Sequence, residues 1–282
     1  MKIEASSSCP LMSNTSGFET LSDLVRDSTG IELPQTKKTL TLSRLRHRFK
    51  ALTVSTLEEY CEIVMSKHGE AEKNQMISAL TTNVTGFFRE SHHFDILSQH
   101  IREKILTSQS RDPIRIWSAG CSRGQEPYSI AIHLTENVPE LENFDHRILA
   151  SDIDYSVLNA AKSGTYSSRE VAQISDDRKE KYFHTKINQD GKRCLKVEKN
   201  IRSKISFKHL NLMQKWPMTK KMDAIFCRNV VIYFDASTQD RLWERFKNLL
   251  KPDGIIFVGH SERITHAGYI PLGATTYGLK TL

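Results

Sequence analysis

Residues 114–128 read IRIWSAGCSRGQEPY, and this segment sets the architecture of the larger part of the chain. Its first six residues form an apolar-rich run typical of a buried strand. A loop with Gly120 and Gly124 follows, and a helix is expected from about Pro127. Glycines in such a loop let the backbone approach a ligand closely at the carboxyl end of a strand. The segment predicts a strand–loop–helix unit that binds a ligand, although a tight turn without a ligand would give the same pattern.

The same alternation of short apolar runs and helical stretches continues toward the C-terminus. The expected strands span 114–119, 147–151, 205–210, 223–227 and 255–259. A helix is expected near 237–250, and the turn at 251–254 (KPDG) should stop it sharply before the last strand. Strands that alternate with helices indicate a mostly parallel sheet. Residues 164–200 interrupt the pattern and predict a β-hairpin insert approached by a helix.

The N-terminal part of the chain has helical periodicity and no strand signal. Residues 1–16 are Ser-rich and predict a flexible tail. Residues 17–80 should form a small all-helical domain of four helices, and residues 81–112 a linker and helix. The predicted fold class is therefore α/β: a Rossmann-like doubly wound domain over 113–282 with a small β-subdomain insert, preceded by the helical N-terminal domain.

Composition narrows the class of protein. The 282 residues are 38% hydrophobic and 26% charged, which suits a globular protein with a buried core. No run approaches the roughly 20 apolar residues of a membrane span, so we expect no direct membrane insertion. Nor does an apolar segment follow Lys2, so we expect no signal peptide. Five cysteines without a CxxC pair argue against a disulfide framework or a metal site and favour a reducing, cytoplasmic location.

The spacing of the glycines in the loop narrows the choice of ligand. A GxGxxG dinucleotide pattern is absent because Gly120 and Gly124 are four residues apart. This disfavours a nicotinamide dinucleotide and leaves S-adenosylmethionine, which has no pyrophosphate. Asp152 ends the second expected strand, where a carboxylate can accept hydrogen bonds from both ribose hydroxyls. An N-cap of the next helix is the other role open to an aspartate here, and Asp154 suits that role better.

Three stretches of the chain resemble the CheR family of chemotaxis-receptor glutamate methyltransferases. They are 83–90 (NVTGFFRE), 124–129 (GQEPYS) and 226–235 (FCRNVVIYFD), in that order and spacing. The C-terminal segments 250–254 (LKPDG) and 259–262 (GHSE) fit as well. The resemblance runs from about Phe18 to the C-terminus, and it implies a doubly wound methyltransferase domain behind the helical domain.

The resemblance also implies a set of site residues. We expect the cofactor S-adenosylmethionine, with S-adenosylhomocysteine as product and no metal, to contact Asn83, Thr85, Arg89, Gly120, Glu126, Asp152, Asn211, Leu212, Arg228 and Asn229. The resemblance places Arg89 and Tyr233 nearest the transferred methyl, as the catalytic residues. Gln125 is one departure, because many relatives carry an acid there.

Methyl transfer to a glutamate needs little acid–base chemistry. A carboxylate with a pKa of about 4.3 is already ionised at neutral pH, so no general base is required. Arg89 and Tyr233 would act by holding the carboxylate in line with the methyl group. The adjacent His92 and His93 need no catalytic role and are expected on an exposed helix face.

A net charge of +7 favours an acidic partner, which could be nucleic acid, anionic lipid or a protein surface. Residues 33–57 contain no acid, so their basic side chains are expected to be uncompensated and predict a docking surface: Lys37, Lys38, Arg44, Arg46, Arg48 and Lys50. A solvated helix face is the plainer interpretation of such charges. The resemblance supplies the partner, the cytoplasmic methylation helices of methyl-accepting chemotaxis receptors. In some relatives the β-subdomain also binds a C-terminal receptor peptide by adding a strand.

Two other functions fit parts of the sequence. The basic charge suits a nucleic-acid methyltransferase, but the loop after the fourth expected strand reads CRNV instead of the (D/N/S)PP(Y/F) that grips a flipped base. We therefore expect no nucleic-acid partner. A non-catalytic adaptor that binds cofactor or receptor without turnover is the second alternative, and the intact set of motifs argues against it.

Overall fold

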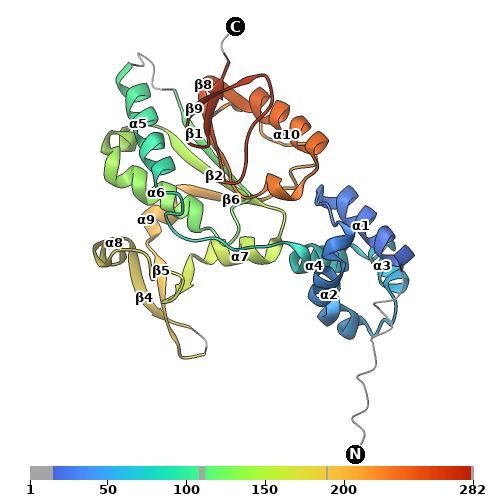
Figure 1. Cartoon of the computed structure of the whole chain (residues 1–282). Helices are drawn as coiled ribbons and strands as arrows, with labels where there is room; N and C mark the ends of the chain where they lie inside the picture. The colour runs from blue at the N-terminus through green and yellow to red at the C-terminus, as the bar shows by residue number, and fades with distance from the viewer. Residues whose placement is uncertain (1–14, 108–111, 189, 281–282) are drawn as a thin grey trace, which may run out of the picture. The chain divides into compact units, whose positions relative to one another are not determined.

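A computed structural model describes residues 15–107, 112–188 and 190–280 of the chain (Figure 1). The chain forms two compact units. The first contains the N-terminal residues through Thr82 together with Tyr233–Asp235, and the second contains Asn83–Ile232 and Ala236–Leu282. Of the expected tail, residues 1–14 lie outside the described part, whereas Thr15 and Ser16 already belong to the first helix.

The first unit is all-helical. Its elements are α1 (Thr15–Thr29), the 3-10 turn η2 (Gln35–Lys37), α2 (Lys38–Leu52), α3 (Leu57–Met65) and α4 (Glu70–Leu80). A capping box starts α3, since the Thr56 side chain accepts the Glu59 N–H while Glu59 accepts the Thr56 N–H. The predicted apolar stripes meet in one core, in which Phe18, Leu45 and Tyr60 are fully buried. The four expected helices are confirmed.

The second unit is built on a seven-stranded sheet with the strand order β6-β2-β1-β7-β8-β10-β9. Its strands are β1 (Ile114–Ala119), β2 (His146–Asp152), β6 (Ile205–His209), β7 (Met222–Cys227), β8 (Leu250–Val258), β9 (Tyr269–Gly273) and β10 (Thr276–Leu279). The first five pair in parallel. Their carboxyl ends therefore meet at one edge of the sheet, with β1 at the reversal of strand order where doubly wound folds bind ligands.

Helices cover both faces of this sheet. They are α5 (His92–Thr107), α6 (Gln125–Asn137), α7 (Tyr155–Ser163), α9 (Lys199–Arg202) and α10 (Ala236–Leu249), with 3-10 turns η3 (Pro139–Asn143) and η4 (Val231–Tyr233). Figure 1 shows α5 and α6 on one side of the sheet and α10 on the other. The predicted doubly wound α/β architecture is confirmed. No helix in the described ranges is long and apolar enough to cross a membrane.

Two details of the C-terminal part differ from the expectation. Strand β8 begins at Leu250, so residues 251–254 are not a turn between helix and strand. The pairing instead jumps from Met222–Leu250 to Ala224–Ile255, which leaves these residues as an irregularity inside the strand. The antiparallel hairpin β9–β10 was not anticipated. Its strands are short, and Pro271 in β9 weakens a strand pattern.

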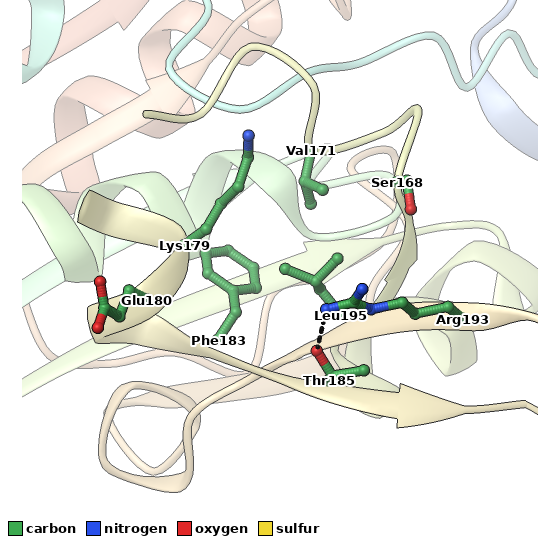
Figure 2. A pocket seen from close by; sticks show the side chains of 8 residues that line it. All are labelled: Ser168, Val171, Lys179, Glu180, Phe183, Thr185, Arg193 and Leu195. Atoms are coloured by element: carbon green, nitrogen blue, oxygen red, sulfur yellow. Dashed lines mark hydrogen bonds between the residues drawn. The ribbon is translucent and has the colours of Figure 1, made fainter. Parts of the chain in front are cut away.

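The insert forms a sheet of its own, with the order β3-β5-β4. It consists of β3 (Thr165–Ser167), α8 (Asp176–Tyr182), β4 (Phe183–Ile187) and β5 (Arg193–Val197), which confirms the expected hairpin and its helical approach. A hollow of about 400 Å³ lies between α8 and the strands, as Figure 2 shows. Lys179 and Glu180 of α8 line it, as do Arg193 and Thr185, which are joined by a hydrogen bond of 3.2 Å.

Candidate functional site

The glycine loop after β1 turns back onto the end of β2. The N–H groups of Gly120 and Cys121 both donate to the Ser151 carbonyl at 2.9 Å. Gly120 has a φ of +84°, and a Cβ there would lie 2.4 Å from a methyl of Val230 in the loop after β7. A side chain is therefore excluded at Gly120 both by backbone conformation and by space. The glycine brings the loops after β1 and β7 together, rather than only opening space for a ligand.

Asp152 ends β2 inside this loop cluster and is nearly buried. Its carboxylate accepts the backbone N–H of Ser122 at 2.8 Å and that of Asp154 at 2.9 Å. Burial raises the pKa of Asp152 to about 6, although these two N–H groups oppose the shift. Asp154, and not Asp152, caps α7 by accepting the Ser156 N–H. The sequence prediction that Asp154 is the N-cap is thus confirmed, and Asp152 is left available for a ligand.

The segment that begins at Asn83 is fastened to the same loops. The Asn83 side chain donates to the Asp154 carboxylate at 2.9 Å, and the Ser122 hydroxyl donates to the Asn83 carbonyl at 3.0 Å. Farther along, the Phe88 N–H donates to the Ser129 hydroxyl at 2.9 Å. Asn83 therefore contacts both residues whose N–H groups bind Asp152, although Asp152 lies 69 positions later in the sequence.

Arg228, which follows β7, lies at the centre of a buried ion cluster. Its side chain is 3% exposed, with Nη1 3.0 Å from Glu126 Oε2 and Nη2 3.1 Å from Glu90 Oε2. Nη2 also donates to the Arg89 carbonyl at 2.5 Å. Glu126 accepts a further hydrogen bond of 2.7 Å from the Ser118 hydroxyl at the end of β1. Arg228 is therefore not a surface charge, and it joins three segments that are far apart in sequence.

This cluster has an uneven charge balance. With both carboxylates ionised, one guanidinium shared by Glu90 and Glu126 leaves one negative charge on these three side chains. Arg89 offsets that charge only weakly, because its Nε is 4.0 Å from Glu90 Oε1 and its side chain is partly exposed to solvent. Burial raises the pKa of Glu126 despite its bonds to Arg228 and Ser118. Burial also acts on Glu90, but Arg228 and His260 outweigh it, so the pKa of Glu90 is lowered. The excess negative charge would favour a cationic group at this edge of the sheet.

The loop after β7 is held by a carboxylate that the sequence did not single out for any role. Glu262 is 3% exposed, and its Oε1 accepts the N–H groups of Val230 and Val231 at 2.9 Å each. Its Oε2 accepts those of Asn229 at 2.7 Å and Gly259 at 2.6 Å. The motif GHSE at 259–262 carried the only signal for Glu262, and its meaning emerges only when both loops are seen together.

Asn211 and Leu212 follow β6 and are nearly buried. The Asn211 side chain accepts the Met213 N–H at 2.9 Å, and the N–H of the preceding Leu210 donates to the Asp152 carbonyl at 3.0 Å. These contacts place Asn211 and Leu212 on the chain next to Asp152. The structure thus brings the predicted residues of β1, β2, β6 and β7 to the carboxyl edge of one sheet.

Three predicted residues are less fixed by contacts. Thr85 is half-buried, and Arg89 is 37% exposed with its Nε 4.0 Å from Glu90 Oε1. Tyr233 groups with the helical unit, where its carbonyl accepts the N–H of Glu32 at 2.9 Å. The catalytic roles of Arg89 and Tyr233 stay predictions.

Two expectations about charged side chains are wrong. His93 is fully buried, unlike the exposed His92, and its Nε2 lies 2.9 Å from the Thr275 hydroxyl. The basic residues of 37–50 are not all uncompensated, because Arg48 forms a two-point ion pair with the buried Glu72. Each of these side chains has a hydrogen-bond partner from a different segment of the chain, and a helical wheel does not reveal such partners.

Arg44 is engaged as well, since it donates to the Leu80 carbonyl at 2.7 Å and to the Thr82 hydroxyl at 3.0 Å. Lys38 is half-buried, with its ammonium 5.9 Å from the centre of the Phe18 ring. The residues of the predicted docking surface that are exposed to solvent are Lys37, Arg46 and Lys50.

The residues at this edge fit the cofactor S-adenosylmethionine. The Asp152 carboxylate offers about four acceptor positions, and the N–H groups of Ser122 and Asp154 leave capacity for a ribose diol. The net negative charge of Glu90, Arg228 and Glu126 suits a sulfonium with its amino group. Buried polar atoms also lack a hydrogen-bond partner within the described residues, among them Gln125 Oε1 and Arg228 Nε. Such orphaned atoms are expected where a polar ligand binds.

Comparison with known proteins gives the same assignment for both parts of the chain. Residues 83–276 match the family model for the CheR methyltransferase SAM-binding domain, and residues 16–81 match that for the CheR methyltransferase all-alpha domain. A probable chemotaxis protein methyltransferase of Rhizobium etli is 40% identical over 92% of this chain and 97% of its own length.

Two further relatives cover nearly the whole chain. Chemotaxis protein methyltransferase 2 of Pseudomonas aeruginosa is 40% identical over 92% of this chain and 91% of its own length. The chemotaxis protein methyltransferase of Escherichia coli is 36% identical over 93% of this chain and 90% of its own length. The likeness therefore extends through both units.

Proposed function

Because the chain belongs to the CheR methyltransferase family, we propose that it esterifies glutamate side chains of chemotaxis receptors. The family and its chemotaxis relatives give the broader activity, S-adenosylmethionine-dependent methylation in chemotaxis. The glutamyl acceptor and the receptor are the proposed part. The products would be a glutamyl methyl ester and S-adenosylhomocysteine, formed by a cytoplasmic protein-glutamate O-methyltransferase.

One observation carries this proposal. Arg228 joins Glu126 of the first strand–helix unit to Glu90 and to the backbone of Arg89. The two stretches that most specifically mark the family, 83–90 and 226–235, thus meet at the predicted cofactor site. A constellation assembled from remote segments is a stronger indication of function than any of its motifs alone.

The proposed reaction requires no general base, because the acceptor carboxylate is already ionised. When bound, the cofactor would supply an electrophilic methyl group to the carboxylate. Asp152 would hold the ribose, Glu126 and Glu90 would face the positive charge, and Arg89 would hold the acceptor in line. Burial raises the pKa of the Cys121 and Cys227 thiols, so neither is a ready nucleophile.

Attack by an anion on a cation gives neutral groups, so charge disappears as the transition state forms. A strong fixed counter-charge would stabilise the reactant carboxylate more than the transition state and would not speed the step. This favours orientation and partial loss of water as the roles of Arg89 and Tyr233. The exposed side chains of Lys37, Arg46 and Lys50 would dock the acidic methylation helices of the receptor.

The test is transfer of radiolabelled methyl from S-adenosylmethionine to receptor-containing membranes, followed by mild alkali. Release of volatile methanol is expected, because carboxyl methyl esters are labile to base. The Asp152→Asn variant serves as a control with a weakened cofactor site. Label that survives alkali would contradict the ester.

Two other results would also overturn the proposal. Methylation of duplex DNA or transfer RNA, without labelling of receptor, would indicate a nucleic-acid methyltransferase. Binding of S-adenosylhomocysteine without transfer to any receptor preparation would indicate an adaptor. A receptor peptide bound along the insert would extend the proposal to a second contact site, by strand addition.

A further inference from the structure

Behind the ion cluster, a buried histidine connects the site to the C-terminal hairpin. His93, in the first turn of α5, lies with its Nδ1 3.5 Å from Glu90 Oε2. Its Nε2 lies 2.9 Å from the hydroxyl of Thr275, in the turn between β9 and β10. Glu90 in turn contacts Arg228 at 3.1 Å. The contacts therefore run from Thr275 through His93 and Glu90 to Arg228.

The backbone next to His93 is strained. Phe88 has a φ of 53° and Glu90 a φ of 56°, both in the left-handed region that disfavours residues other than glycine. Such a conformation persists only where the surroundings hold it, and it clusters at functional sites. Arg89 lies between these two residues, so whatever holds Glu90 also holds the backbone of Arg89.

The protonation state of His93 follows from its neighbours. Burial and the nearby Arg228 and His92 lower the pKa of His93 to about 3, against the opposing charge of Glu90, so the ring is neutral at neutral pH. Both His93 Nδ1 and Glu90 Oε2 are buried and make no conventional hydrogen bond. A lone pair on Nδ1 would face the carboxylate and repel it. A proton on Nδ1 faces it favourably, and the Thr275 hydroxyl, 2.9 Å away, can then donate to Nε2. The Ala274 carbonyl would accept from the opposite tautomer, but it lies farther from Nε2, at 3.4 Å.

We propose that His93 is a positioning residue for methyl transfer, whose Nδ1–H holds Glu90 against Arg228 while Thr275 fixes the ring. Through Glu90 it orients Arg228, which binds Glu126 and the Arg89 carbonyl. The inference rests on the proposed function only through its cofactor site and does not depend on the acceptor.

Two amide substitutions at His93 distinguish the roles of its two ring nitrogens. In His93→Asn, the side-chain NH₂ can occupy the place of Nδ1–H, whereas in His93→Gln it reaches the place of Nε2. His93→Phe retains the ring volume without either nitrogen. Calorimetric titration with S-adenosylhomocysteine should show about tenfold weaker binding for the Gln and Phe variants. Rescue to within about threefold of the parent is expected for Asn. Equal losses for Asn, Gln and Phe would overturn the proposal.

A spectroscopic measurement tests the same point without a substitution. Long-range ¹H–¹⁵N correlation spectra of the full chain, labelled at histidine, report the tautomer of His93. The expected result at neutral pH is a neutral ring protonated at Nδ1, and Thr275→Val should shift it toward the Nε2–H form. A parent ring that is protonated at Nε2 alone, or at both nitrogens, would overturn the proposal.

The exposed His68 provides the matched control, because His68→Gln changes the same side chain away from the site. The His68→Gln variant should bind S-adenosylhomocysteine like the parent. A tenfold loss of affinity in this variant would show that the loss at His93 is not specific to its position. These measurements use the product alone. A failure to methylate receptors would therefore overturn the proposed acceptor and leave the role of His93 to be judged separately.

Discussion

The carboxylate of Glu262 accepts the backbone N–H of Asn229 at 2.7 Å, and this bond anchors the loop that follows β7. The same side chain accepts hydrogen bonds from the N–H groups of Val230 and Val231, so a single buried carboxylate pairs with three successive backbone donors of the loop. Asn229 has a φ of 59°, in the left-handed region that asparagine adopts more readily than most residues other than glycine. Glu262 therefore stabilises the tight loop that begins directly after Arg228.

Replacement of Glu262 by Gln should be strongly destabilising. Glutamine offers one acceptor oxygen and turns an NH₂ group toward backbone donors, which leaves buried N–H groups unpaired. We expect the free energy of unfolding to fall by about 2–3 kcal/mol and the binding of S-adenosylhomocysteine to weaken. Denaturant titration and calorimetry measure the two effects. Glu140→Gln, an exposed position, is the matched control, and the same small change in both variants would refute the anchoring role.

Asp152 predicts a pH dependence of cofactor binding. The pKa of Asp152 rises from 3.8 to about 6 on folding, so the native state binds its proton more tightly than the unfolded chain. Its contribution to the free energy of unfolding therefore declines as pH rises through this window. The ionised form is the one that accepts hydrogen bonds from the ribose hydroxyls. The affinity for S-adenosylhomocysteine should therefore increase as pH rises through the same window.

Calorimetry should find the affinity about tenfold weaker at about pH 5 than at about pH 8, as the ionised fraction of Asp152 falls. Asp152→Asn should bind weakly at both pH values, with a flatter pH profile. An Asn variant that kept both the affinity and the slope of the parent would show that another group is responsible for the pH dependence.

Arg89→Lys tests the orienting role of the guanidinium. Lysine keeps the charge but cannot reproduce the planar fork, so turnover at saturating cofactor and receptor should fall about tenfold or more. The 37% exposed side chain makes few contacts in the described structure, and the stability of the variant should be close to that of the parent. Near-normal single-turnover rates would rule out a geometric role for Arg89.

Sequence periodicity was sufficient to predict the parallel strands of the second unit because they are apolar-rich runs. The expected strand 114–119 coincides with β1, and both expected helices around it are present. The hairpin β9–β10 was missed since Pro271 and short strands give no clear alternation. Local pattern is informative only where an element buries a regular face.

The site was predicted less completely, and the reason is distance along the chain. Asp152 and Glu126 lie at strand–helix junctions, which sequence alone marks. The pairing of Arg228 with Glu90 joins residues 138 positions apart, and no local pattern encodes it. His93 was assigned to the surface because a pair of adjacent polar residues suggests an exposed face, whereas its partner Thr275 lies in the turn between the last two strands.

The exposed basic side chains of the helical unit should control encounter with the receptor. The test uses only Lys37, Arg46 and Lys50, the residues of the predicted docking surface that are exposed to solvent. Arg48 is left out because Glu72 neutralises its charge. Reversal of these three charges to Glu should raise the KM for receptor about tenfold at low salt and leave the KM for S-adenosylmethionine unchanged. Initial rates measured over a range of ionic strength provide both values.

The matched control must change the net charge by the same amount elsewhere. Three exposed lysines of the second unit serve this purpose: Lys162, Lys215 and Lys220. If docking is local to η2 and α2, their reversal should have a smaller effect on the KM for receptor, and the difference should narrow as salt screens both surfaces. An equal rise in KM for the two triple variants would mean that overall charge steers the encounter, and that η2 and α2 carry no specific docking surface.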